Sequence, residues 1–460
     1  MKFRKNTGSN AERNNDRNSD RKPARSAKRA APGIPAPAAP TPGPNAQRLD
    51  EAASALTRVL TFEYPADSVL SRYFRDRHSL GQHDRAFVAE AVFGVLRRKL
   101  LLDQLAPQAT PRQLVLLWLA RVAGYSGREL AALCSTDEKQ WLNTTREQSP
   151  ATMPLSVEAD LPQWVVDRLL PQHDEDFIRD LGRALQEPAP LDLRVNTLRA
   201  TREEVIAKLN AAGMEATPTP WSPIGVRLKG RPALNRHPLF INGAIEVQDE
   251  GSQLLGYLLA PRRTDLVVDF CAGAGGKTLM LGALMNSQGR LYAFDVSTKR
   301  LANLKPRLKR SGLSNLHPHV IAHENDTKVK RLAGKIDRVL VDAPCSGLGT
   351  LRRNPDLKFR QSPQTVAELV VKQTSILQAA ARLVKPGGRL VYATCSLLTE
   401  ENQDIIATFL ANHVEFKLLN CNELLQRQDI MPDGGQQMQL WPHVHRTDGF
   451  FAAVIERSGN

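Results

Sequence analysis

The segment Leu266-Val267-Val268-Asp269-Phe270-Cys271-Ala272-Gly273-Ala274-Gly275-Gly276-Lys277-Thr278 decides the fold class. Its first five residues form an apolar, mostly β-branched run, which predicts a strand buried in a parallel sheet. The glycines follow directly, and a helix is predicted over residues 279–285. Glycines between a strand and a helix let the backbone approach a ligand closely and point helix N-terminal amides at it. The sequence therefore predicts an α/β fold with a ligand-binding loop at a strand end.

The spacing of this loop argues against phosphate ligands. A phosphate-binding P-loop needs glycine at position 271, which is cysteine, and the third glycine of a dinucleotide fingerprint would fall on Thr278. An ATPase or a dehydrogenase is therefore disfavoured. A second strand, predicted over residues 291–294, ends in Asp295, and a carboxylate there suits the two hydroxyls of a ribose. A nucleoside cofactor without a bound phosphate fits best, and S-adenosylmethionine is the obvious candidate.

Two cysteines follow predicted strands further along the chain. Cys345 stands in Val-Asp-Ala-Pro-Cys-Ser-Gly after a strand over residues 338–341, and Cys395 stands in Val-Tyr-Ala-Thr-Cys-Ser after a strand over residues 389–392. A strand-end cysteine is often only a packing residue. However, open α/β sheets bind ligands outside the carboxyl ends of their strands, so two thiols downstream of a cofactor loop favour catalysis.

Methyl transfer to carbon 5 of cytosine would use both thiols. A thiolate that adds to carbon 6 turns the ring into an enamine, which attacks a sulfonium methyl group. A second thiol can assist release of the first sulfur. Asp342, three residues before Cys345, is placed to hydrogen-bond the cytosine edge and stabilise the ring protonated at nitrogen 3. The alternative for Asp342 is a cap of the following turn.

The second half of the chain resembles the RNA cytosine-carbon-5 methyltransferases of the Sun/Fmu (RsmB/RsmF) and nucleolar-protein family. The paired Pro-Cys and Thr-Cys motifs are the most specific features, since a DNA cytosine methyltransferase is expected to use the Pro-Cys thiol as its nucleophile. The similar segments cover most of residues 190–455: 193–197, 247–252, 269–278, 342–356, 394–402 and 448–451.

This resemblance implies a role for each matching residue. Cys395 would be the nucleophile, Cys345 would assist product release, and Asp342 would lie between cofactor and base. The loop residues Cys271, Ala272, Gly273, Ala274, Gly275, Gly276 and Lys277 would hold the methionine part of the cofactor, Asp295 the ribose and Asp326 the adenine edge. The family usually has proline where this chain has Ala274.

The fold expected from these features is a Rossmann-like class I methyltransferase core with two preceding parts. Residues 1–47 are expected to be a disordered tail, basic at first and rich in proline and alanine from residue 31. Residues 48–150 have helical periodicity and loosely resemble the NusB-like domain of RsmB-type proteins. Residues 151–237 are expected to hold linker helices and a small α+β RNA-binding module, and residues 238–460 the methyltransferase domain. The segment Lys385-Pro386-Gly387-Gly388 is expected to be a turn before the strand that leads to Cys395.

The charge of the chain indicates a polyanionic partner. The 460 residues carry a formal net charge of +14. Residues 1–30 hold ten Lys and Arg against three Asp and Glu, so half of the excess lies in the tail. RNA contact and a merely solubilising tail stay open for this segment. Two further hypotheses concern RNA. Arg97, Arg98 and Lys99 mark either an RNA-facing helix side or a charged face in solvent. Arg352 and Arg353 bind phosphate, unless they pair with local acids such as Asp356.

We expect ribosomal RNA as the substrate, because of the resemblance to RsmB-type proteins. The alternatives are transfer RNA as the substrate, or a non-catalytic RNA-binding assembly factor. The target cytosine should lie in a loop or be flipped out, since stacking covers the face that the thiol attacks. The sequence has no apolar leader or membrane span, no zinc-like spacing, and an odd number of cysteines, five. We therefore expect a cytoplasmic, metal-free monomer.

Overall fold

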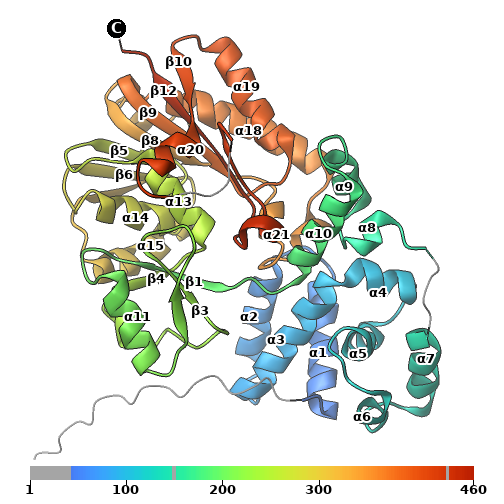
Figure 1. Cartoon of the computed structure of the whole chain (residues 1–460). Coiled ribbons are helices and arrows are strands. Elements are labelled where there is room, and N and C mark those ends of the chain that lie inside the picture. The colour runs from blue at the N-terminus through green and yellow to red at the C-terminus, as the bar shows by residue number, and fades with distance from the viewer. Residues whose placement is uncertain (1–42, 148–151, 431–434, 460) are drawn as a thin grey trace, which may run out of the picture. The chain divides into compact units, whose positions relative to one another are not determined.

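The computed structural model describes residues 43–147, 152–430 and 435–459 (Figure 1). The tail predicted over residues 1–47 therefore lies almost wholly outside the described residues. The first part of the described chain is helical, and its helices bury a common core that includes Leu56, Val92 and Leu117. Its helices are α1 (Ala46–Val59), α2 (Ala66–Asp76), α3 (Gln82–Arg97), α4 (Lys99–Leu105), α5 (Pro111–Arg121), α6 (Gly127–Ala131) and α7 (Thr136–Glu147).

A small antiparallel sheet follows three connecting helices. The helices are α8 (Leu155–Glu158), α9 (Gln163–Leu169) and α10 (Glu175–Gln186). The sheet has the strand order β2-β3-β1-β4, and α11 (Arg202–Ala211) packs on it through Val205 and Leu209. Its strands are β1 (Leu191–Val195), β2 (Ala216–Pro218), β3 (Gly225–Leu228) and β4 (Ile245–Val247), with α12 (Pro238–Ile241) before the last one. This is the predicted small α+β module.

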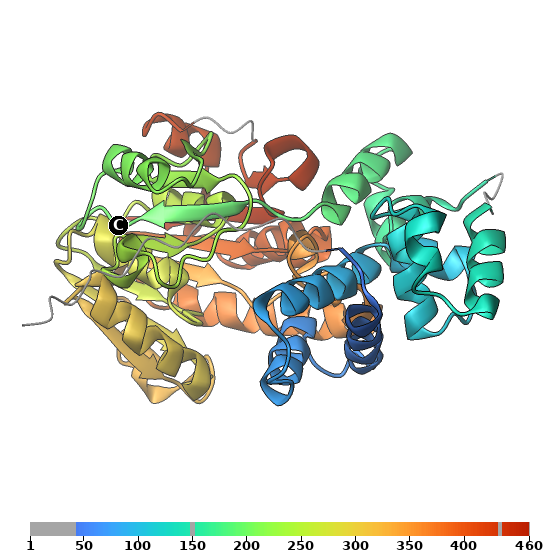
Figure 2. The same ribbon diagram turned by 90° about the horizontal axis from the view of Figure 1, so that it is seen from below.

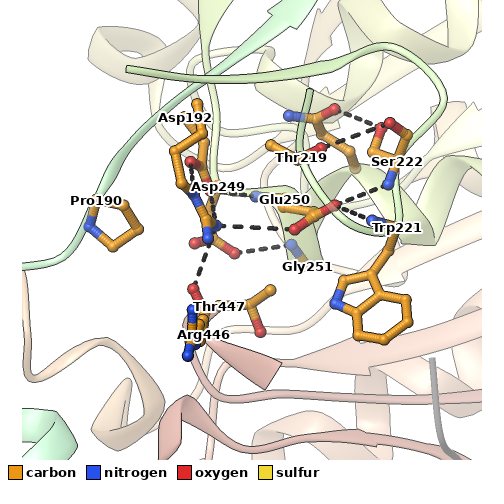
Figure 3. Close-up of polar contacts among 12 residues, drawn as sticks. Pro190, Asp192, Thr219, Trp221, Ser222, Asp249, Glu250, Gly251, Arg446 and Thr447 are labelled. Carbon is orange, nitrogen blue, oxygen red and sulfur yellow. Dashed lines mark hydrogen bonds and ion pairs between the residues drawn. The ribbon is translucent and has the colours of Figure 1, made fainter. Parts of the chain in front are cut away.

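Buried polar contacts join this module to the start of the next domain (Figure 3). Glu250, at the start of α13 (Glu250–Leu259), is fully buried and accepts hydrogen bonds from the backbone N–H groups of Trp221 and Ser222 at 2.5 and 2.8 Å. Arg227 donates to both carboxylate oxygens of Asp192, at 2.7 and 2.9 Å. Its guanidinium also reaches the backbone carbonyl of Arg446 at 3.2 Å. Arg227 also lies 3.7 Å from Glu250, so this ion pair and the hydrogen bonds of Glu250 fix the module to the larger domain.

The larger domain is built on an eight-stranded mixed sheet. Its strand order is β10-β12-β9-β8-β5-β6-β7, with β11 paired to β12. The five strands from β9 to β7 are parallel, and β10, β11 and β12 are antiparallel to their partners. The bounds are β5 (Leu266–Asp269), β6 (Arg290–Asp295), β7 (Leu316–Val320), β8 (Ile336–Asp342), β9 (Val384–Thr394), β10 (Phe416–Leu419), β11 (Met438–Leu440) and β12 (Phe450–Arg457).

Helices cover both faces of this sheet, which lies between them in Figures 1 and 2. Alternate strand residues enter two separate cores: Val267 and Val391 face one, and Val268 and Leu390 face the other. The first core is closed by α13, α14 (Gly276–Leu284), α15 (Thr298–Ser311) and α20 (Cys421–Gln426). The second is closed by α16 (Thr327–Lys330), α18 (Pro363–Ala381) and α19 (Gln403–Asn412). The remaining short helices are η1 (Leu348–Thr350), α17 (Leu357–Arg360), η2 (Thr399–Glu401) and α21 (Pro442–His445).

One local prediction differs from the structure. Lys385–Gly388 is not a turn before a strand but a bulge inside β9. Val384 pairs with Ile336, whereas the next registered pair on β8 is Arg338 with Arg389. Gly387 takes a φ of 71°, so the extra residues are accommodated without ending the strand. The Pro-Gly-Gly sequence is typical of either arrangement, because both require an interruption of regular pairing.

Candidate active site

The carboxyl ends of β5, β6, β8 and β9 border one cavity of about 770 Å³. This is the place where open α/β sheets bind ligands. Most of the predicted site residues line it: Cys271, Ala272, Gly273, Ala274, Gly276, Lys277, Asp295, Asp342, Cys345 and Cys395. Gly275 and Asp326 are not among its lining residues. The topology therefore brings together residues that lie up to 124 positions apart in the chain, from Cys271 to Cys395.

The glycine loop, residues 271–277, leaves β5 and enters α14. Gly275 has a φ of 84°, and a Cβ at this position would lie 2.1 Å from a side-chain carbon of Leu304. Gly275 therefore serves the packing of the loop against α15, which explains why it does not face the cavity. Gly273, with a φ of 55°, has open space where a Cβ would be, and it faces the cavity.

Two arginines bind carbonyl oxygens of the glycine loop. Arg307 of α15 donates to the carbonyl of Ala274 at 2.6 Å and pairs with Glu246 at 2.9 Å. Arg194 of β1 donates to the carbonyl of Gly276 at 2.5 Å and to the side chain of Gln248. Burial lowers the pKa of Arg194 to about 10. Two carbonyl oxygens of the loop are thus held by cations.

Asp295 is where the predicted ribose ligand would need it. Its side chain is buried at the end of β6 and lines the cavity. One carboxylate oxygen accepts the N–H of Gly273 at 2.8 Å, and the other accepts the N–H of Ser297 at 2.6 Å. Each oxygen keeps a further lone pair for a hydroxyl donor. These contacts tie the position of Asp295 to the glycine loop.

Asp326, predicted to contact the adenine edge, does not line the cavity. Its carboxylate accepts the N–H groups of Ala322 and Lys328, both at 2.8 Å, and caps the short helix α16. These hydrogen bonds lower its pKa. Glu324 lines the cavity instead, two residues earlier. The short motif around Asp326 did not distinguish a cap from a ligand contact, since both need an acid at that turn.

Lys277 and Asp342 form an ion pair across the cavity wall. The Lys277 ammonium lies 2.7 Å from the Asp342 carboxylate, and the two side chains are 16% and 28% exposed. Burial opposes the positive charge of Lys277, but the Asp342 carboxylate and the neighbouring anions outweigh it and raise its pKa. In the part of the chain that the structure describes, no backbone N–H of the following turn donates to Asp342, whose partner is Lys277. The glycine loop and the end of β8 are therefore joined by this pair.

Cys345 and Cys395 lie side by side in the two cysteine turns, residues 343–347 after β8 and residues 395–398 after β9. Their sulfur atoms are 3.4 Å apart, and the Cys345 sulfur accepts the N–H of Cys395 at 3.3 Å. The hydrogen bond with Cys395, desolvation and the nearby charge of Glu401 raise the pKa of Cys345 well above its ordinary value. Cys345 therefore keeps its proton at neutral pH.

Asp269 ends β5 beneath the glycine loop. Its side chain is 1% exposed, and one carboxyl oxygen accepts the hydroxyl hydrogen of Thr278 at 2.7 Å. Burial raises its pKa to about 7, and the Asp342 charge adds to this effect. The other oxygen has no hydrogen-bond partner. Asp269 is thus an anchor of the loop whose charge is disfavoured.

Sequence reasoning assigned no role to several other residues that line the cavity. The charged and polar ones are Gln248, Ser252, Ser297, Arg300, Arg307, Glu324 and Lys372. Gln248 and Ser252 fall in a segment that resembles the family, and this was the available signal for them. Arg307 and Lys372 lie in helices whose sequence has no motif, so only the three-dimensional arrangement identifies them.

The arginines expected to contact RNA lie in internal contacts. Arg352 is buried and pairs with Asp448 at 3.1 Å, and Arg353 pairs with Asp448 at 2.5 Å and Asp249 at 3.0 Å. Asp356 is not their partner; it pairs with Arg360 at 3.5 Å. These pairs satisfy the alternative of local acids rather than phosphate.

The cluster on α3 and α4 is also engaged within the chain. Arg97 is buried and donates to the carbonyl of Arg352 at 3.4 Å. Arg98 donates to Gln186, and Lys99 pairs with Asp103 at 2.7 Å. The three basic residues thus do not form an open RNA-facing side.

The described residues hold neither a membrane-spanning helix nor a metal-binding cluster. No helix in residues 43–147, 152–430 and 435–459 is both long and apolar enough to span a membrane. The same ranges contain no group of three or more His, Cys, Asp or Glu side chains that could hold a metal ion.

The parallel sheet, the glycine loop after β5 and the acid that ends β6 define a Rossmann-like methyltransferase that depends on S-adenosylmethionine. A family model described as 16S rRNA methyltransferase RsmB/F matches residues 256–456, and the ferredoxin-like domain of the same methyltransferases matches residues 161–235. A probable ribosomal RNA small subunit methyltransferase B of Synechocystis sp. is 32% identical over 422 residues, which cover 83% of this chain and 93% of that protein. The chain therefore belongs to the RsmB/F family of 16S rRNA methyltransferases.

Other relatives agree with this membership. A probable ribosomal RNA small subunit methyltransferase B of Bacillus subtilis is 29% identical over 423 residues, with coverage of 83% of this chain and 92% of that protein. The crystal structure of PH0851 matches with a TM-score of 0.75 at 27% identity, and covers 91% of this chain and 100% of that chain. A methyltransferase homologue from Pyrococcus horikoshii matches with a TM-score of 0.57 at 28% identity, over 67% of this chain and 100% of that chain. The resemblance and the fold class expected from the sequence are confirmed.

Proposed function

We propose that this enzyme transfers a methyl group from S-adenosylmethionine to carbon 5 of a cytosine in small-subunit ribosomal RNA, through a covalent adduct between Cys395 and carbon 6. The observation that carries the proposal is the pair of sulfur atoms 3.4 Å apart at the edge of a cavity shared with the glycine loop. A methyltransferase that acts on a more nucleophilic atom would need neither thiol. The names of the relatives support ribosomal RNA as the substrate class.

The residues around the cavity suit this cofactor. Asp295 offers carboxylate lone pairs to a ribose, and the amides of the glycine loop and the Lys277 ammonium suit the amino-acid part. Glu324 is the acid on the cavity wall that suits an adenine edge, in place of Asp326. When bound, the cofactor supplies an electrophilic methyl group. The fit rests on the chemistry of the residues that line the cavity.

In the proposed first step the thiolate of Cys395 forms a bond to carbon 6, and the electrons of the 5,6 double bond move to carbon 5. Asp342 holds the proton at nitrogen 3, so that no full negative charge develops on the ring. Its ion pair with Lys277 fixes the carboxylate in one orientation. Carbon 5 would then form a bond to the methyl group, and the bond from that methyl group to the cofactor sulfur would break with its electron pair left on the sulfur.

In the second step the ring loses the carbon 5 proton to water, and the bond between carbon 6 and the Cys395 sulfur breaks. The electrons of the broken carbon–hydrogen bond restore the 5,6 double bond, and the sulfur leaves as a thiolate. Cys345, which keeps its proton because its pKa is raised, donates a hydrogen bond to that thiolate. The two cysteines therefore have separate tasks.

The test is methyl transfer with identification of the product nucleoside. The protein is incubated with labelled S-adenosylmethionine and ribosomal RNA that lacks its modifications, and the RNA is digested and analysed by mass spectrometry. The proposal requires the label in 5-methylcytidine from small-subunit RNA. Label in another nucleoside would overturn the cytosine assignment, and label only with transfer RNA would overturn the substrate assignment.

A further inference from the structure

Glu401 is a buried acid that contacts both cysteine turns. It ends the short helix η2, directly after the turn that follows β9, and its side chain is fully buried. An isolated buried carboxylate is unfavourable, so its surroundings must supply hydrogen-bond donors. Glu401 does not line the cavity, and it has no part in the methyl-transfer steps proposed for the cavity residues.

Four donors meet the two carboxylate oxygens of Glu401. The backbone N–H of Ser346 lies at 2.8 Å and its hydroxyl at 2.5 Å. The amide of Gln373 donates at 2.9 Å, and the hydroxyl of Ser396 donates to the oxygen that also accepts the Ser346 hydroxyl. The two serine hydroxyls are themselves 3.2 Å apart. Both oxygens are therefore satisfied by residues of the two turns and by α18.

The two serines are the residues that directly follow the cysteines. Ser346 follows Cys345, and Ser396 follows Cys395. A displacement of either serine therefore moves the adjacent backbone from which the thiol projects. Gln373 also donates to the carbonyl of Pro344 at 2.9 Å, on the other side of Cys345. One carboxylate thus fixes both thiol-bearing segments relative to each other.

We propose that Glu401 is a positioning residue that sets the approach of Cys345 to Cys395, and that it is required for both the attack and the release steps. The inference rests on the proposed function, because it assigns the two steps to the two thiols. Glu401 acts through Ser346 and Ser396 and does not touch the substrate. A misplacement of about 1 Å in a reacting group costs on the order of 100-fold in rate, which sets the expected scale of the effect.

The first test compares Glu401→Gln with Glu400→Gln. Glutamine at position 401 would direct an amide donor at serine donors, whereas Glu400 is 32% exposed and pairs only with Arg168 at 2.6 Å. The substrate is RNA with 5-fluorocytidine at the target position, where no carbon 5 hydrogen can leave, so that the adduct persists. We expect Glu401→Gln to form the adduct about 100-fold more slowly. The affinity for S-adenosylmethionine should be unchanged, and Glu400→Gln should match the wild type.

The second test separates the two steps and does not depend on whether Glu401→Gln folds. Ser396→Ala removes the hydrogen bond beside the nucleophile, and we expect adduct formation to slow by about tenfold. Ser346→Ala removes the hydrogen bond beside Cys345, and we expect an adduct to accumulate on RNA that carries ordinary cytidine. A purely structural role of Glu401 would make the two serine variants alike.

Three results would overturn the inference. Adduct formation by Glu401→Gln at the wild-type rate would show that the carboxylate does not position the nucleophile. Equal losses of cofactor binding, attack and release in all variants would show structural support only. Absence of both adduct and methyl transfer in the wild type would overturn the proposed function instead, and the role of Glu401 with it.

Discussion

The glycine loop and the cysteine turns border the same cavity, but they are held by opposite kinds of group. Arginines hold the glycine loop through its carbonyl oxygens: Arg307 at Ala274 and Arg194 at Gly276. A buried carboxylate holds the cysteine turns through hydroxyl and amide hydrogens. The loop is thereby fixed through its acceptors, and the cysteine turns are fixed through their donors.

The two halves of the site, the glycine loop and the cysteine turns, meet different requirements. A cofactor loop must present donors and exchange its ligand in every turnover, whereas two reacting sulfur atoms must keep a fixed separation. Lys277 and Asp342 connect the halves by their 2.7 Å ion pair. Changes on the loop side should therefore act mainly on cofactor affinity and stability, and changes on the cysteine side mainly on the chemical steps.

Asp342→Asn should give the largest effect, since this residue serves the chemistry and connects the two halves. We expect kcat to fall by about 1,000-fold, because the proton at nitrogen 3 loses its charged partner. The Kd for S-adenosylmethionine should change by no more than about threefold. Asp337→Asn, at the other end of β8, is the matched control and should retain wild-type transfer. A similar loss of affinity for S-adenosylmethionine in Asp342→Asn would contradict the separation of cofactor binding from the chemical steps.

Asp269 gives a pH-dependent test of the loop side. Its pKa is raised from 3.8 to about 7, so the folded state binds its proton more tightly than the unfolded state does. The contribution of this group to stability is therefore present below about pH 4 and is lost as pH rises to about 7, by on the order of 4 kcal/mol. In urea unfolding, Asp269→Asn should lack this loss. If the free energy of unfolding changed with pH equally in the wild type and in Asp269→Asn, the raised pKa of Asp269 would be contradicted.

The two left-handed glycines form a matched pair within the loop. Gly275→Ala would place a Cβ 2.1 Å from Leu304, whereas Gly273→Ala meets nothing within 4 Å. We expect Gly275→Ala to lower the free energy of unfolding by about 3 kcal/mol, and Gly273→Ala by about 1 kcal/mol. Thermal and urea unfolding measure both. Equal losses would mean that the backbone conformation alone, and not the contact with α15, sets the requirement for glycine.

Arg307→Ala should have a smaller effect than Gly275→Ala. Loss of the hydrogen bond to Ala274 loosens the loop, and we expect the Kd for S-adenosylmethionine to rise by about tenfold while kcat at saturation stays near the wild-type value. Lys305→Ala, on an exposed position of the same helix, is the control. Isothermal titration calorimetry and saturation kinetics give the two numbers. A fall in kcat without a change in Kd would reverse the assignment of the loop.

The sequence predicted those parts of the site in which a strand and the functional residues that follow it lie in one short segment. The glycine loop and the two cysteines each follow a strand within a few residues, so strand prediction alone brings them to one sheet edge. Gln373 and Arg307 contact these segments from 29 and 33 residues away, and nothing local marks them. Arg194 falls in a segment that resembles the family, but its partner in the loop lies 82 residues away. Glu401 lies in a segment that resembles the family, but its burial between two serines depends on the packing of β8 against β9.

The residue predictions that the structure does not support share one cause. Arg352, Arg353 and Asp326 were assigned to ligands because of their charge and position, and each is engaged by a partner in the chain. The sequence alone does not show whether a charged residue near a site is already paired, since its partners come from distant segments. The sequence predicted that residues 48–150 are helical. It did not predict the short helices between the long ones, because these depend on tertiary packing.

The most direct test of the central claim is the fate of the protein–RNA adduct in Cys395→Ala and Cys345→Ala, measured on unmodified ribosomal RNA with S-adenosylmethionine by denaturing gel electrophoresis. The account predicts neither methyl transfer nor adduct in Cys395→Ala, and an adduct that accumulates in Cys345→Ala because release is impaired. An adduct that forms in Cys395→Ala and is absent from Cys345→Ala would contradict the assignment of the two thiols.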